Sequence, residues 1–234
     1  MIDLIQNYWR PFLFGDGHEL SGLVITLWLL IGSVFLGFVL ALPLAIARSS
    51  RIKCLNYPVW IFSYIFRGTP LYIQLLLLYS GIFSLEIVQD SATLRKIFSS
   101  GINCALIAFT LNTCAYSLEI FAGAIKETSK DEIAAGLAFG MSQYTLYRLI
   151  ILPSALRRSL PQYSNEVVLM LHATTLAFTV TVPDILKVAR DANSETYLVI
   201  ESFTIAAILY ACLSFILIGL FKMAEKRWLK HLQH

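Results

Sequence analysis

The stretch from Leu20 to Ala47 contains no charged residue, and it is followed by the cations Arg48, Arg51 and Lys53. A bilayer core about 30 Å thick needs roughly 20 helical residues that each rise about 1.5 Å. This run therefore predicts a transmembrane helix. Of the 234 residues, 57% are hydrophobic and 14% are charged, whereas soluble domains are about 45–50% apolar and about 25% charged. An ordinary water-soluble fold is excluded.

Four further apolar segments are long enough to cross a membrane. They run over 57–79, 102–125, 163–182 and 200–221. Transmembrane barrel strands have about 10 residues with strict alternation, a pattern that these segments lack. The sequence predicts a single all-α membrane domain over 1–234, with five transmembrane helices that begin with 20–47. A short amphipathic helix at the N-terminus, with Ile2, Ile5, Trp9 and Phe12 near helical spacing, is expected to lie in the outer interface.

The distribution of Lys and Arg predicts the orientation. Segments 48–56, 126–161 and 222–234 hold three, five and four of the 18 Lys and Arg residues, and the opposite segments hold five. Cytoplasmic loops carry the excess of these residues, so we expect a periplasmic N-terminus and a cytoplasmic C-terminus. The net charge of +3 is too small to predict nucleic-acid binding, and the four scattered cysteines lack metal-ligand spacing.

One predicted cytoplasmic segment, 126–161, is much longer than the others. Ser129 is placed to cap a helix and Glu132 lies in its first turn, where negative charge is favourable. Gly136 and Gly140 are four residues apart, which predicts one bare helical face. The segment is either a linker of interfacial helices or a docking helix for a cytoplasmic partner.

Several motifs resemble the permease subunits of bacterial ABC importers, in particular those of the polar amino acid uptake family. They occur in the family's order and extend over nearly the whole chain. The matching residues are Phe66-Arg67-Gly68-Thr69-Pro70-Leu71 with Gln74, Ala115-Tyr116 with Glu119-Ile120, Gly140 with Ile150, Leu152 and Pro153, and Asn165-Glu166 after Pro161.

The resemblance implies the type I importer permease fold and a coupling helix in 126–161 that sits in a cleft of an ATPase subunit. The family's signature glutamate falls on Ala134 here. Glu132, two positions earlier, lies roughly 200° around the helix, so the usual carboxylate contact is not expected from this subunit. The residues implied in coupling are Glu132, Ala134, Ala135, Gly136, Phe139, Gly140, Leu152 and Pro153.

Within that family, segments 111–125, 151–167 and 171–191 look like the M-type subunits of importers for histidine, lysine, arginine and ornithine. This likeness implies a multi-pass protein of the bacterial inner membrane. The implied partners are a Q-type second permease, two copies of an ATPase and a periplasmic binding protein. No glycine is followed by lysine, so the phosphate-binding motif of ATPases is absent. We therefore expect a transport subunit that is no enzyme and binds no cofactor, with ATP used by the partner.

Three ionisable residues fall inside the predicted spans, where an isolated charge is costly. The hypothesis is that Glu119 or Glu166 pairs with Arg67, while the remaining carboxylate faces a cationic substrate. Pro70 is expected to kink its span and to help line a cavity. The predicted substrate path comprises Glu166, Asn165, Glu119, Tyr116, Asn112 and Thr69, and the predicted gating motif comprises Arg67, Gly68, Pro70 and Gln74.

Two alternatives stay open at this point. The chain could be a permease for another polar amino acid, such as glutamine or glutamate. It could instead be a membrane enzyme or a non-transport scaffold that uses Glu119, Glu166 and His172. Co-purification with an ATPase separates a permease from the second alternative.

Overall fold

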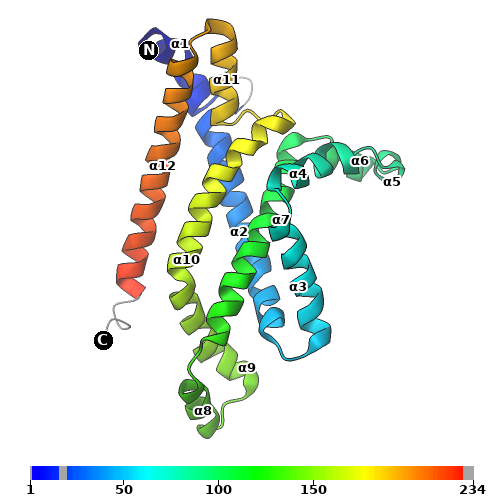
Figure 1. Cartoon of the computed structure of the whole chain (residues 1–234), viewed down its shortest axis with the longest axis vertical. Helices are drawn as coiled ribbons and strands as arrows, with labels where there is room; N and C mark the ends of the chain where they lie inside the picture. The colour runs from blue at the N-terminus through cyan, green and yellow to red at the C-terminus, as the bar shows by residue number, and fades with distance from the viewer. Residues whose placement is uncertain (1, 16–19, 229–234) are drawn as a thin grey trace.

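The computed structural model describes residues 2–15 and 20–228, and these are almost entirely helical. Extended pairing in the described residues is limited to isolated bridges such as the one between Gly22 and Asp184. The longest helices are α2 (Gly22–Ser49), α7 (Gly101–Lys126), α10 (Leu152–Ala173) and α12 (Val199–Trp228), and they run along the long axis of the molecule (Figure 1). The prediction of an all-α fold is confirmed.

Helices α2 and α7 form the centre of the bundle because small residues allow them to approach closely. A Cβ atom added to Gly37 on α2 would lie 2.4 Å from Cγ2 of Thr113 on α7. Farther along the same contact, Phe121 of α7 packs edge-on to Phe38 of α2, with ring centroids 5.6 Å apart. Tyr163 of α10 joins this aromatic cluster, so the three helices share one core.

The predicted spans correspond only partly to single helices. Helices α2, α7 and α12 are long and apolar enough to cross a membrane. The pair formed by α3 (Lys53–Gly68) with α4 and its π-helical continuation passes the same test together, with a bend of 102°. The described helices therefore include three apolar spans, or four with the bent pair counted, against the five predicted.

The remaining predicted span, 163–182, differs in its boundaries. Helix α10 begins at Leu152, contains Pro161 in its interior and ends at Ala173. The chain then continues as the 3₁₀ helix η3 (Thr174–Val180). Helix α10 packs against α7 and α12, but its polar residues lower its hydropathy. The helix therefore starts well before the predicted boundary at residue 163.

The predicted span 57–79 is broken rather than kinked. Helix α3 ends at Gly68, α4 (Leu71–Leu76) begins after Pro70, and the π-helix η1 (Leu77–Ile82) continues α4. Thr69 has extended backbone angles, φ −113° and ψ 143°, as expected for a residue before proline. Two consecutive residues thus leave the helical conformation, and the chain turns sharply at this point.

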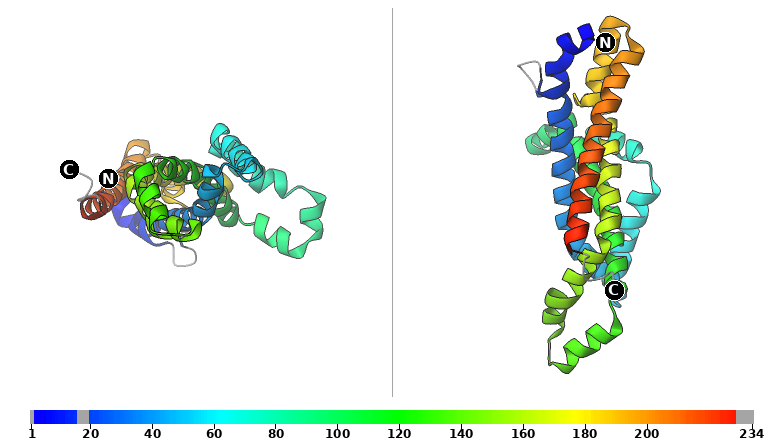
Figure 2. Two further views of the ribbon diagram at one scale, coloured as in Figure 1. Left: turned by 90° about the horizontal axis from the view of Figure 1, so that it is seen from below. Right: turned by 90° about the vertical axis from the view of Figure 1, so that its left-hand side faces the viewer.

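The two ends of the bundle carry different elements (Figures 1 and 2). One end has α1 (Ile2–Leu13) and α11 (Ile185–Thr196), and the other has α8 (Lys130–Ala138), α9 (Gln143–Leu146) and the π-helix η2 (Tyr147–Ile151). Helices α5 (Glu86–Asp90) and α6 (Ala92–Phe98) project sideways. The cation-rich segments 48–56 and 126–161 lie at the same end, as the predicted orientation requires.

The predicted N-terminal helix is present as α1. Its Phe12 is 2% exposed, whereas Trp9 is 44% exposed, so one face packs on the bundle while the opposite face lies free. The side chains of Ile2 and Ile5 lie outside the described residues. The placement of this helix in the outer interface stays a prediction.

Candidate functional site

The break between α3 and α4 is held by polar side chains. Helix ends leave backbone carbonyl groups without partners. The side-chain amide of Gln74 donates to the carbonyl oxygens of Phe66 at 2.8 Å and Thr69 at 3.0 Å. The Asn112 amide from α7 donates to the same Phe66 oxygen at 3.2 Å. Gln74 and Asn112 are both buried, so their contacts stabilise the broken helix from within the bundle.

Three of the predicted residues line an open hollow beside this break, and a fourth, Tyr116, contacts one of them. The hollow has a volume of about 460 Å³ and is lined in part by Arg67, Gly68 and Thr69. The Arg67 guanidinium lies over the ring of Tyr116, 5.3 Å from its centroid. The Tyr116 hydroxyl donates to the Arg67 carbonyl oxygen at 3.5 Å. A cation, an aromatic ring and hydroxyl groups are therefore presented together.

Glu166 lies on α10 and is 7% exposed. Thr113 on α7 and the cation Arg67 on α3 are polar neighbours of its carboxylate. The neighbouring Asn165 is exposed. A nearly enclosed carboxylate inside a membrane bundle can match a positively charged ligand.

The predicted ion pair of Arg67 with Glu119 or Glu166 is not formed. Within residues 2–15 and 20–228, the ion pairs join Arg48 to Glu119 and Lys187 to Asp191. Arg67 instead stacks on an aromatic ring, which attracts cations through its negative face.

Glu119 is bound by a residue from the end of α2. The Arg48 Nε donates to its Oε1 at 2.8 Å, and the Arg48 Nη1 donates to Oδ1 of Asn56 at 2.8 Å. These contacts join α2, α3 and α7 near the end of the bundle that carries α8 and α9. The sequence does not predict this pair, because Arg48 and Glu119 are 71 residues apart and lie on different helices.

His172 has a neighbour on α12. Its Nε2 lies 3.0 Å from the Ser214 hydroxyl. The contact connects α10 with α12, as expected for a histidine that is hydrogen-bonded within a bundle.

The predicted coupling segment folds as a compact helical hairpin over 129–151. The Ser129 hydroxyl accepts from the Asp131 backbone N–H at 3.2 Å and caps α8 as predicted. Gly136 is buried, and a Cβ added to it would lie 2.6 Å from Cδ1 of Leu146. Gly140 has φ +76° and follows the end of α8. The predicted bare face of Gly136 and Gly140 is therefore wrong, because Gly136 packs inside the hairpin and Gly140 terminates its helix.

The outward surface of the hairpin is formed by other predicted residues. Phe139 is 85% exposed, and Glu132, Ala134 and Ala135 are exposed as well. Leu152 and Pro153 begin α10, directly after the π-helix η2. An exposed aromatic side chain beside small residues forms a surface that a partner protein can cover.

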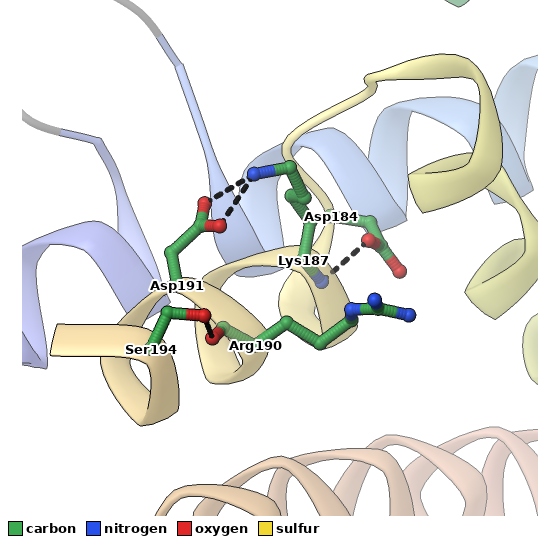
Figure 3. Close-up of polar contacts among 5 residues, drawn as sticks. All are labelled: Asp184, Lys187, Arg190, Asp191 and Ser194. Carbon is green, nitrogen blue, oxygen red and sulfur yellow. Dashed lines mark hydrogen bonds and ion pairs between the residues drawn. The ribbon is translucent and has the colours of Figure 1, made fainter. Parts of the chain in front are cut away.

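The opposite end contains a buried carboxylate that sequence reasoning missed (Figure 3). Asp184 is 0% exposed and caps α11 by accepting from the Lys187 N–H at 2.9 Å. Its second oxygen accepts from the Tyr210 hydroxyl at 3.1 Å. Burial raises the pKa of the Asp184 carboxyl to about 6. The Lys187 ammonium pairs instead with Asp191 at 2.5 Å. The signal available in the sequence was a helix-capping aspartate before an apolar run.

Apolar helices, a broken helix secured by polar side chains and an exposed hairpin at one end together define a multi-pass membrane transport subunit. The chain belongs to the family of binding-protein-dependent transport system inner membrane components, which matches residues 33–230. It is therefore an ABC-importer permease of the inner membrane, and such permeases work with a partner permease, an ATPase and a substrate-binding protein. The predicted fold and location are confirmed.

Individual relatives agree with this assignment. The chain is 58% identical over 233 residues to the histidine/lysine/arginine/ornithine transport system permease protein HisM of Escherichia coli K12, covering 100% of this chain and 98% of the relative. It is 39% identical over 217 residues to the octopine transport system permease protein OccM of Rhizobium radiobacter, covering 93% and 86%. These relatives are transport permeases, which disfavours a membrane enzyme.

Solved structures show the same architecture. A crystal structure of an amino acid ABC transporter with histidines matches with a TM-score of 0.80 and 26% identity, covering 95% of this chain and 96% of that one. The inward-facing MetNI methionine ABC transporter matches with a TM-score of 0.70 and 18% identity, covering 87% and 93%. The second likeness bears on the fold alone.

Proposed function

We propose that this chain is the M-type permease of an ATP-driven importer for the basic amino acids histidine, lysine, arginine and ornithine. The observation that carries the proposal is the 58% identity to HisM along the entire chain. The complete importer would contain a Q-type second permease, two ATPase copies and a periplasmic binding protein. This chain binds no cofactor of its own, and ATP is hydrolysed by the ATPase because the chain lacks a phosphate-binding loop.

The substrate path is proposed to pass the hollow beside the broken helix. Arg67 would attract the substrate carboxylate, and Glu166 would match its cationic side chain. Thr69, Tyr116 and the exposed Asn165 would supply polar contacts. Asn112 supports the break, since its amide donates to the Phe66 carbonyl, and Gln74 acts with it.

ATP binding to the ATPase would change the conformation of the substrate path, and the hairpin would transmit this change. Binding of ATP closes the two ATPase subunits, and their movement displaces α8 and α9. The displacement reorients the long helices, so that the path opens in turn to the periplasm and to the cytoplasm. The exposed surface around Phe139 supports this contact.

The direct test is uptake by the full assembly in proteoliposomes with ATP inside. We expect ATP-dependent accumulation of labelled lysine, arginine, histidine and ornithine, with glutamine and glutamate as comparisons. Uptake confined to glutamine, glutamate or octopine would contradict the proposed substrate class.

Two carboxylate variants test the path with matched chemistry. Glu166→Gln should raise the KM for lysine about tenfold, because one charge-assisted interaction is lost. Glu119, also predicted to line the path, is instead paired with Arg48. Glu119→Gln is therefore the control and should leave the KM for lysine unchanged. Co-purification with the ATPase verifies assembly of both variants. A KM for lysine in Glu166→Gln equal to that of the wild type would remove Glu166 from the path.

A further inference from the structure

Arg158 lies on α10, close to the base of the hairpin, and its side chain reaches back to the end of α7. Its Nη2 donates to the Ala124 carbonyl oxygen at 2.9 Å and to the Thr128 hydroxyl at 2.8 Å. Its Nη1 donates to the Ser154 hydroxyl at 2.5 Å. One guanidinium thus connects α10 with the point where the chain leaves α7.

The hydrogen-bond partners of Arg158 on the α7 side lie where α7 is linked to α8, a connection that we call the α7–α8 joint. Ala124 is in the last turn of α7, where carbonyl groups have no intrahelical partner and the helix dipole favours a cation. Thr128 lies between the end of α7 at Lys126 and the cap of α8 at Ser129. Arg158 therefore fastens both the end of one helix and the link to the next. The rigid, planar guanidinium suits such divergent contacts better than an ammonium group.

The contacts are enclosed. Thr128 is 5% exposed, and the Nε of Arg158 is buried without a hydrogen-bond partner among the described residues. Arg157, the adjacent cation, is exposed. The Arg158 guanidinium is therefore fixed by three hydrogen bonds and by the residues that enclose it. The Arg157 side chain, in contrast, lies at the surface.

The hairpin is connected to the rest of the bundle at few points, so a displacement of the hairpin can be transmitted only through them. Among the described residues, α8 packs mainly on α9 and η2, and η2 continues directly into α10. A displacement of α8 can therefore travel through the α7–α8 joint or through η2. Arg158 ties these two routes together, because it belongs to α10 and binds the joint.

We propose that Arg158 is a positioning residue that makes the hairpin and the adjoining ends of α7 and α10 move as one body. This inference rests on the proposed function, since it assumes an ATPase that pushes α8. Without the hydrogen bonds of Arg158, the link between α7 and α8 changes conformation when α8 is displaced. ATP is then hydrolysed with little reorientation of the substrate path.

The test compares ATP hydrolysed with lysine transported in the same proteoliposomes. Arg158→Gln should raise the ratio of hydrolysed ATP to imported lysine about tenfold, as expected for the loss of a charge-assisted hydrogen bond. Thr128→Val removes one acceptor at constant shape and should raise the ratio by a smaller factor. Arg157→Gln, an exposed cation next to Arg158, is the matched control and should leave the ratio unchanged. The double variant at 128 and 158 should match Arg158→Gln alone, because the two residues share one interaction.

The outcomes separate the possible roles. An unchanged ratio in Arg158→Gln and Thr128→Val overturns the proposal, and so does a proportional fall of hydrolysis and transport, which indicates a merely structural role. If Arg158→Gln does not assemble with its partners, Thr128→Val decides. A wild-type importer that carries a different amino acid would contradict the proposed function alone, because the ratio can be measured with that substrate.

Discussion

At the scale of single residues, Asp184 shows how burial and hydrogen-bond partners set the pKa of one carboxyl group. Burial raises its pKa, while the Lys187 N–H and the Tyr210 hydroxyl act in the opposite direction. The folded-state pKa of about 6 exceeds the ordinary aspartate value of about 3.9. The folded protein therefore holds the proton more tightly than the unfolded chain. This contribution to stability is fully present below about pH 4 and is lost as the pH rises through about 6.

Asp184→Asn should remove this pH dependence, because the amide oxygen still accepts from the Lys187 N–H but does not ionise. Between pH 4 and pH 7, the wild-type free energy of unfolding should fall by about 2 kcal/mol relative to that of the variant. Unfolding of the full chain in detergent across this pH range measures the difference. The control is Asp191→Asn, which alters an exposed aspartate on the same helix. Parallel pH profiles for wild type and Asp184→Asn would contradict the account.

At the scale of elements, the broken helix between α3 and α4 is the feature on which the candidate site depends. Pro70 supplies no N–H group, and two residues adopt extended angles, so helical hydrogen bonds are missing at this point. Side chains from α4 and α7 replace them. The site is thus built on a backbone conformation that would be unstable without Gln74.

Gln74→Leu should lower the free energy of unfolding by about 1–3 kcal/mol, because the Phe66 and Thr69 carbonyl groups lose a buried donor. Gln143→Leu, the same change at an exposed position on α9, should leave stability within about 0.5 kcal/mol. Thermal unfolding of the assembled importer measures both variants. A Gln74→Leu protein as stable as the wild type would show that the break needs no side-chain donor.

The sequence predicts some elements well and others poorly for a physical reason. Helices α2, α7 and α12 follow from apolar runs, and the cap at Ser129 follows from a local hydrogen bond. The start of α10 is not visible in hydropathy, because its first turns are polar. The burial of Gly136 is not predicted either, because it results from contact with Leu146. That contact forms only when the hairpin folds.

The candidate site divides in the same way. Arg67, Gly68 and Thr69 are adjacent in one motif, so their common location could be predicted. The pairing of Arg48 with Glu119 and of Asp184 with Tyr210 joins different helices. Such pairs depend on helix packing, and the position of a residue along its own span does not determine them.

At the scale of the whole molecule, the two ends are built for different tasks. One end carries α11 with its charged surface, and the opposite end carries the hairpin (Figure 1). Between them, α12 exposes an apolar face that includes Phe215, which is 74% exposed. A face of this kind is covered by lipid or by a second permease, as the proposed heterodimer requires.

In the proposed mechanism, the hairpin end of the molecule receives the force of the ATPase. A photo-crosslinking residue at Phe139, 85% exposed, and another at Tyr197, 86% exposed near the opposite end, test this claim in the assembled importer. This mechanism predicts that position 139 crosslinks to the ATPase subunit and that position 197 does not. A crosslink to the ATPase from position 197, or its absence from position 139, would contradict it.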